Sequence, residues 1–182
     1  YGSMVIEVGK PIYTFYLSKS AGVSPATGKQ LYYCYYRYAV DEKGAMVTER
    51  CPEYVTDDVS LATMSKYYYG SRQPLFSGSI ASNFTIFKDF DLSFLTTYSL
   101  GGRIMDGLYD SAMHVTYPGN NWHRNILRRW QKPGDVTDIP MVEIGGSYAS
   151  VGESLVDASY FAIKNITFGY TLPSRLTEKA RI

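Results

Sequence analysis

The sequence has no run of about 18 consecutive apolar residues, so no transmembrane helix is expected. It also lacks an excess of either charge. The 18 Lys and Arg residues against 17 Asp and Glu residues give a formal net charge of +1. This balance argues against binding to nucleic acid or to another strongly anionic surface.

Residues that carry chemistry are scarce. The chain has two histidines, His114 and His123, whose spacing matches no metal-binding motif. No G-x-S-x-G sequence is present to position a serine nucleophile. Two acidic pairs, at 57–58 and at 106 and 110, are predicted to be solvated loop residues rather than paired catalytic carboxylates or calcium ligands. We therefore predict a protein that is not an enzyme and has neither a metal site nor a cofactor.

Tyrosine and glycine, in contrast, are abundant, with 18 and 16 residues. Tyrosine favours β-strands and membrane–water interfaces, and glycine marks turns. The stretch Asp157–Pro173 reads as one long strand. From 165 onward, Ile166, Phe168, Tyr170 and Leu172 share one face, and Asn165 and Thr167 lie with small residues on the other. A strand that is apolar on one side and small or polar on the other is typical of an outer-membrane barrel wall.

The residues 74–102 predict a long hairpin with a tight turn at Lys88-Asp89-Phe90. Each arm has roughly the 9–11 residues that a tilted strand needs to cross a bilayer. Short turns of such barrels lie in the periplasm, so Phe87 and Phe90 are expected in the inner aromatic girdle. Together with 165 and 167, the small polar residues of the arms are predicted to face the lumen: Ser77, Ser79, Asn83, Thr85, Ser93, Thr97, Asn165 and Thr167.

The first third of the chain predicts further strands at 11–17, 30–40 and 45–50, with a loop at 21–28 and one short helix within 51–73. Cys34 and Cys51 flank a hairpin turn at Asp41–Gly44. With the turn centred between residues 42 and 43, the two cysteines fall opposite each other and form a candidate disulfide. The alternative is two unpaired cysteines, because a slip of one residue separates them.

Residues 103–155 are predicted to form one long extracellular loop, and a connection of this length is usually functional. A short helix is expected at 121–131. The aromatic residues of this loop are candidates for stacking on a sugar or packing against a partner protein. The alternative is that they pack the loop's own core, as we expect for Trp130. The candidate binding residues are Tyr109, Tyr117, Trp122 and His123.

Several stretches resemble one known family. Residues 157–173 follow the pattern D-x-S-Y-x-x-x-K-N-I-T-x-G-Y-T-L-P, and 22–28 resemble G-V-D-P-x-T-G with Ser24 in place of the acid. Residues 74–79 resemble P-x-F-x-G-G with Ser79 in place of glycine, 87–93 resemble Y-K-x-F-D-L-S, and 129–140 resemble R-W-x-x-P-G-D-x-T-D-I-P. These motifs, in this order, resemble the SusC/RagA family of TonB-dependent outer-membrane transporters.

The resemblance implies an all-β fold, with antiparallel strands that form part of a transmembrane barrel of about 22 strands. Residues 1–182 would be a partial barrel domain without the plug and the final strands, because about six or seven candidate strands are fewer than the roughly eight of the smallest barrels. It further implies import of oligosaccharides or peptides across the outer membrane of a Bacteroidetes-type bacterium. The partners would be a SusD-like surface lipoprotein, TonB acting through the N-terminal part, and outer-membrane lipid.

One alternative from another class stays open. A soluble β-sandwich that binds carbohydrate or mediates adhesion also has Tyr-rich short strands and Gly/Pro turns. It predicts that the apolar residues of the long strands pack in a closed core: Ile80, Phe84, Phe94 and Phe168.

Overall fold

The computed structural model describes residues 3–113, 119 and 121–180. They divide into two units, which we treat separately. The mixed unit contains residues 1–72 and 103–156, and the hairpin unit contains residues 73–102 and 157–182. No helix in these described ranges has both the length and the apolarity needed to cross a membrane.

The mixed unit is built on a five-stranded antiparallel sheet. Its strands are β1 (Met4–Val5), β2 (Thr14–Val23), β3 (Gln30–Val40), β4 (Met46–Thr56) and β5 (Lys66–Ser71). β2 is central, because it pairs with β1, β3 and β5. The strand predicted at 30–40 is confirmed, and the one at 45–50 corresponds to the first half of β4. The strand predicted at 11–17 is displaced, because β2 extends to Val23 and the loop predicted at 21–28 begins only after it. β5 and the second half of β4 were not predicted.

One short helix, α1 (Val59–Met64), packs against β3. It starts at Asp58, whose carboxylate accepts from the amides of Ser60 and Leu61, as an N-terminal cap should. The predicted short helix within 51–73 is therefore confirmed. Two apolar clusters form the core of this unit. The first contains Tyr32, Cys34, Leu61, Ala62 and Ala149, and the second contains Phe15, Leu17 and Leu155.

Residues 103–157 are more structured than the predicted loop with one helix. They contain β8 (Arg103–Met105) paired with β9 (Leu155–Asp157), α2 (Gly107–Met113) and two 3₁₀ turns, η1 (Arg124–Arg128) and η2 (Gly152–Ser154). The helix predicted at 121–131 is wrong in type and length. The chain forms only η1 there, because His123 caps the turn and Arg129 already leaves helical geometry.

The segment also packs back onto the sheet of its own unit. The Trp130 indole lies against Gly28, where a Cβ would overlap the ring, and its Nε1 donates to the Pro25 carbonyl at 2.9 Å. Gly28 has φ of +72°, a conformation that favours glycine. Trp130 thus has a packing role, but against the 21–28 loop rather than within its own segment.

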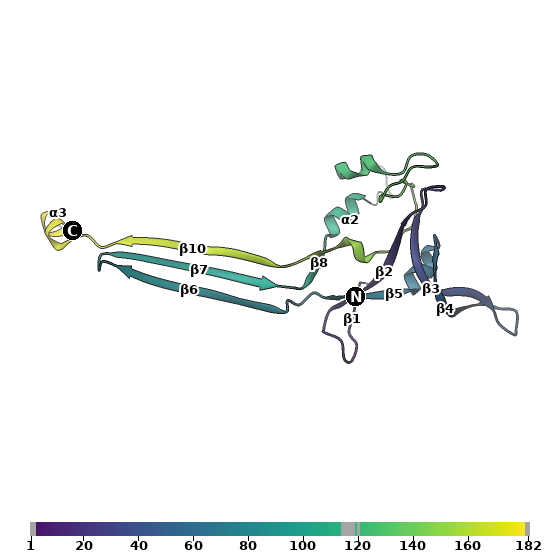
Figure 1. Cartoon of the computed structure of the whole chain (residues 1–182), viewed down its shortest axis with the longest axis horizontal. Helices are drawn as coiled ribbons and strands as arrows, with labels where there is room; N and C mark the ends of the chain where they lie inside the picture. Colours follow the sequence, from purple (N-terminus) through teal and green to yellow (C-terminus); the bar gives the residue numbers. More distant parts are fainter. Residues whose placement is uncertain (1–2, 114–118, 120, 181–182) are drawn as a thin grey trace. The chain divides into compact units, whose positions relative to one another are not determined.

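The hairpin unit is a three-stranded antiparallel sheet in the order β10-β7-β6. Figure 1 shows its three long strands side by side: β6 (Phe76–Ile86), β7 (Phe90–Leu100) and β10 (Tyr160–Tyr170). Each has 11 residues, and the predicted hairpin is confirmed with a turn at 87–89. β10 contains a β-bulge between Ile163 and Asn165, and the helix α3 (Ser174–Ala180) follows it.

The candidate disulfide is not formed, and the alternative of two unpaired cysteines is the one found. Cys34 lies opposite Tyr54 in the β3–β4 ladder, and both Cys34 and Cys51 are free thiols. Val40 pairs with Met46, which centres the turn on Lys43, and a register shift beyond Tyr36 displaces the strands further. The coarse fold is as expected, with antiparallel sheets and a few short helices, but the described strands form open sheets rather than a closed barrel.

Candidate functional site

The hairpin unit has two chemically opposite faces. Residues that lie directly opposite each other in an antiparallel ladder point to the same side, so the register assigns every side chain of the regular ladder to a face. The polar face carries small and hydroxylated residues: Ser77, Ser79, Ala81, Asn83 and Thr85 of β6, Asp91, Ser93, Leu95, Thr97 and Ser99 of β7, and Tyr160, Ala162, Asn165, Thr167 and Gly169 of β10.

The opposite face is apolar and aromatic along its whole length. It consists of Phe76, Gly78, Ile80, Ser82, Phe84 and Ile86 of β6, Phe90, Leu92, Phe94, Thr96, Tyr98 and Leu100 of β7, and Phe161, Ile163, Ile166, Phe168 and Tyr170 of β10. Most of the large side chains are exposed; Phe161 and Phe168, for example, are each 66% accessible. The hydroxyl of Thr96 is satisfied by donating to the Ile80 carbonyl at 3.3 Å. An exposed apolar face of this extent marks contact with a membrane or a partner.

Aromatic rings gather at the turn end of the apolar face. The ring of Phe90 lies 4.6 Å from that of Tyr170 and 5.7 Å from that of Phe168, and Phe87 projects from the turn itself with 86% of its surface exposed. At the other end, Tyr98 covers Gly78, where a Cβ would come within 2.7 Å of the phenol oxygen. Aromatic residues at both ends of an apolar band are the arrangement of membrane-interface girdles.

The structure brings the predicted lumen-facing residues together on the polar face, since each is a member of that ladder side. That this face borders a lumen stays a prediction. The closed core of the β-sandwich alternative is not found. Ile80, Phe84 and Phe168 are 51%, 49% and 66% exposed, and no second sheet covers them within the described part of the hairpin unit.

The loop aromatics are less free than expected. The rings of Tyr109 and His123 meet edge to face, with their centres 4.9 Å apart. Asn125 bridges the two residues: its side-chain amide donates to the Tyr109 hydroxyl at 3.2 Å, and its backbone N–H donates to His123 Nδ1. Trp122 is 43% exposed. Tyr117 and His114 lie outside the described residues. A binding role for Tyr109, Tyr117, Trp122 and His123 stays a prediction, and Trp122 is the most accessible of the described three.

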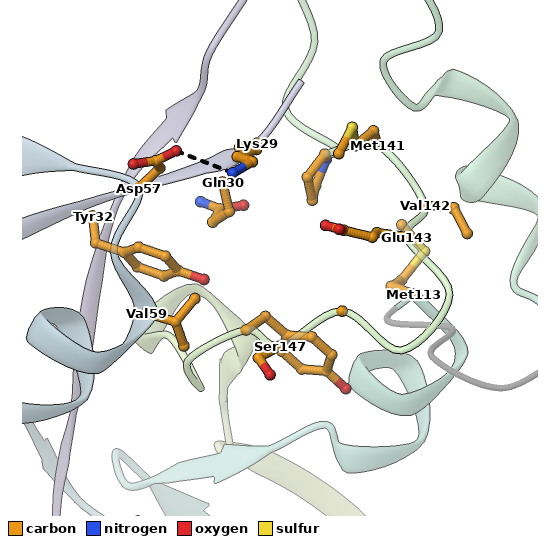
Figure 2. Close-up of a pocket in the computed structure, with 13 residues that line it drawn as sticks. Lys29, Gln30, Tyr32, Asp57, Val59, Met113, Met141, Val142, Glu143 and Ser147 are labelled. Atoms are coloured by element: carbon orange, nitrogen blue, oxygen red, sulfur yellow. Dashed lines mark ion pairs between the residues drawn. The ribbon is translucent and has the colours of Figure 1, made fainter. Parts of the chain in front are cut away.

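A pocket of about 140 Å³ opens in the mixed unit (Figure 2). The start of β3, the entry to α1, the end of α2 and residues 140–148 line it. Lys29 Nζ lies 3.5 Å from Asp57 Oδ2 at its edge. Figure 2 shows the carboxylate of Glu143 and the hydroxyl of Tyr32 directed into the space. Among the described residues, no group of three or more His, Cys, Asp or Glu side chains is placed to hold a metal ion.

Solved structures share this fold. The chain matches the RagAB peptide importer in the "closed-closed" state with a TM-score of 0.66 and 24% identity, over 97% of this chain and 18% of that chain. It matches the RagAB peptide transporter with a TM-score of 0.65 and 24% identity, over 95% and 18%. The chain thus spans about a fifth of the length of these proteins, and the likeness concerns the fold. No protein-family model and no curated protein matches the sequence.

Sequence reasoning missed the pocket. The sequence predicts Asp57 to be a solvated loop residue, and no motif marks Lys29 or Glu143. They come from stretches more than 20 residues apart and follow no periodic pattern. One signal was available: Pro140-Met141-Val142 is a short apolar run inside an otherwise polar segment, which indicates a buried or ligand-lining stretch.

Proposed function

We propose that the chain forms part of the barrel wall and the extracellular portion of an outer-membrane, TonB-dependent importer of the SusC/RagA type. In this proposal β6, β7 and β10 cross the membrane, with residues 103–155 on the extracellular side. The importer takes up oligosaccharides or peptides together with a SusD-like surface lipoprotein. TonB acts through an N-terminal part outside this sequence.

The observation that carries the proposal is the two-sided sheet of the hairpin unit. Its apolar face would be unfavourable in water, where each exposed Å² of apolar surface costs about 25 cal/mol relative to burial. Facing lipid, the same surface is buried and the polar face is left to line water. Strands of 11 residues match the roughly 9–11 that a tilted spanning strand requires.

The free edges of β6 and β10 place a requirement on the proposal. Each is the outermost strand of the described sheet, with one side of its backbone unpaired. Unpaired edges are not tolerated in lipid, so further strands must continue the sheet on both sides. The match to RagAB over nearly the whole chain is consistent with such neighbours, and RagAB's description as a peptide importer makes peptides the first substrate class to test.

The proposal is tested on envelopes of cells that express the protein. Membrane fractions are separated, treated with SDS with or without boiling, and blotted with an antibody against residues 74–102. We expect an outer-membrane band that migrates differently before and after boiling, as folded barrels do, and that is larger than the 20.5 kDa of this chain. A soluble band that boiling does not shift would contradict the proposal.

A further inference from the structure

The pocket of the mixed unit combines an unpaired acid, a buried hydroxyl and an apolar wall. We propose that it binds a primary ammonium group carried on a short aliphatic stem, as found in a lysine side chain or at the N-terminus of a peptide. Glu143 is the counter-ion in this site, Tyr32 is a second acceptor, and the methionine and valine side chains hold the stem. The inference goes beyond the proposed import function, because it specifies a ligand chemistry for a site that the function does not require.

The charges of the pocket favour a cation. Its lining includes one cationic side chain, Lys29, and two carboxylates, Asp57 and Glu143, so its formal charge is +1 − 2 = −1. Lys29 and Asp57 neutralise each other at 3.5 Å. The Glu143 carboxylate, in contrast, has no hydrogen-bond or ion-pair partner among the described residues. The uncompensated charge of the pocket is therefore negative and lies on the Glu143 carboxylate, which points into the space in Figure 2.

Tyr32 provides a fixed neutral acceptor in the lining of the same pocket. Its side chain is 1% exposed, and its hydroxyl oxygen already accepts from the Ala149 amide at 3.1 Å, which holds the ring in place. Burial raises the pKa of Tyr32, with the Ala149 hydrogen bond opposing it, so the phenol stays protonated at neutral pH. A phenol oxygen has two lone pairs, and one remains for an N–H of the ligand.

The rest of the wall suits a short hydrocarbon stem. Met113, Met141, Val142, Val59 and Pro140 line the pocket, and methionine side chains adapt to stems of different shape. A space of about 140 Å³ is similar to cavities of roughly 150 Å³ that accommodate a benzene-sized molecule.

The experiment measures binding of three capped tripeptides to the intact protein in detergent by isothermal titration calorimetry. Acetyl-Ala-Lys-Ala-amide presents only a side-chain ammonium, and H-Leu-Ala-Ala-amide presents only a terminal ammonium. Acetyl-Ala-Lys(acetyl)-Ala-amide has the same stem without the charge. We expect at least one ammonium probe to bind about tenfold or more tightly than the acetylated probe, the range for a hydrogen bond to a charged group. The probe that binds shows whether the site takes the ammonium group of a lysine side chain or that of a peptide N-terminus.

Variants locate the site. Glu143→Gln removes the charge with little change in shape and is expected to weaken the ammonium probe by about tenfold or more. Glu42→Gln, the same change at an exposed residue of the β3–β4 turn, is the matched control and should leave binding unchanged. Equal binding of charged and acetylated probes, or equal binding by both variants, would overturn the inference. Because the acetylated probe needs no change in the protein, the test holds even if a variant folds poorly, and it does not depend on membrane insertion.

Discussion

A pair of adjacent arginine substitutions tests which side of the hairpin unit meets lipid. Ile80 and Ala81 are neighbours at the middle of β6, five and six residues into an 11-residue strand. Ile80 lies opposite Thr96 on the apolar face, and Ala81 lies opposite Leu95 on the polar face. Ile80→Arg and Ala81→Arg therefore add the same group at the same depth, on opposite sides of the sheet.

The expected difference follows from the cost of charge in lipid. An arginine on the lipid face of a barrel at the bilayer midplane costs about 2–4 kcal/mol, whereas a lumen position carries no such penalty. Since about 1.4 kcal/mol is a factor of ten, Ile80→Arg should reduce the folding equilibrium constant by roughly thirty- to several-hundred-fold. Ala81→Arg should change it by less than about tenfold.

The assay is reversible folding of the complete importer into phospholipid vesicles over a urea series. It is followed by the fraction of protein whose migration shifts on boiling. The midpoint of unfolding should move to lower urea for Ile80→Arg alone. Equal shifts for the two variants would show that neither face is in lipid. A larger shift for Ala81→Arg would reverse the facing of the sheet and refute the lumen assignment.

Three further outcomes are expected. Thr167→Leu should leave outer-membrane assembly nearly intact while Phe168→Lys lowers the amount of heat-modifiable protein, because only the second puts a charge on the apolar face; equal yields would contradict this. Gly152→Ala should destabilise the mixed unit by about 1–3 kcal/mol in thermal unfolding, since its Cβ would overlap the Tyr69 ring, while Gly107→Ala, with open space around it, should not. Burial, with a smaller effect of Glu153, raises the pKa of Tyr69 to about 12 from 10.0. The stability that this neutral phenol contributes is therefore complete below pH 10.0 and is lost as the pH rises from 10.0 to about 12. Tyr69→Phe should reduce the loss of circular dichroism signal over that pH range. An unchanged loss would exclude the burial argument.

The hairpin unit was predictable because its pattern is local. In β6 and β7 apolar and small residues alternate with a period of two over full strand lengths, and only Ser82 and Thr96 interrupt the apolar face. Their hydroxyls need partners, and the structure shows one for Thr96 on the Ile80 carbonyl. Local periodicity therefore determined both the strands and the side to which each residue points.

Register in the β3–β4 hairpin was not predictable to one residue. The turn contains an acid that reorganises it: Asp41 Oδ1 accepts from the amides of Lys43 and Ala45, both at 2.8 Å. This bonding centres the turn on Lys43, half a residue later than the centre between residues 42 and 43 that the sequence predicts. A displacement this small is enough to separate Cys34 from Cys51, because side chains alternate sides at every step.

The mixed unit was predicted least well, because long-range contacts determine its form. β5 is a six-residue strand that depends on its pairing with β2, and the segment 140–150 is held by contacts with distant residues, such as the Ala149 amide with Tyr32. Neither leaves a periodic signal in the sequence. The pocket is a product of the same contacts, so its residues became visible as a group only in three dimensions.

The bulge in β10 keeps the apolar side chains of the strand on one face along its whole length. Ahead of it the apolar positions are odd-numbered, Phe161 and Ile163, and after it they are even-numbered, Ile166 and Phe168. If Lys164 were paired in a regular ladder instead of being taken up by the bulge, the first third of the strand would present its apolar side chains to the polar side. A deletion of Lys164 is thus expected to remove the bulge and to leave Ile163 on the apolar face and Asn165 on the polar face. A strand of this kind can also absorb a one-residue insertion during evolution by gaining or moving such a bulge, with its two faces intact.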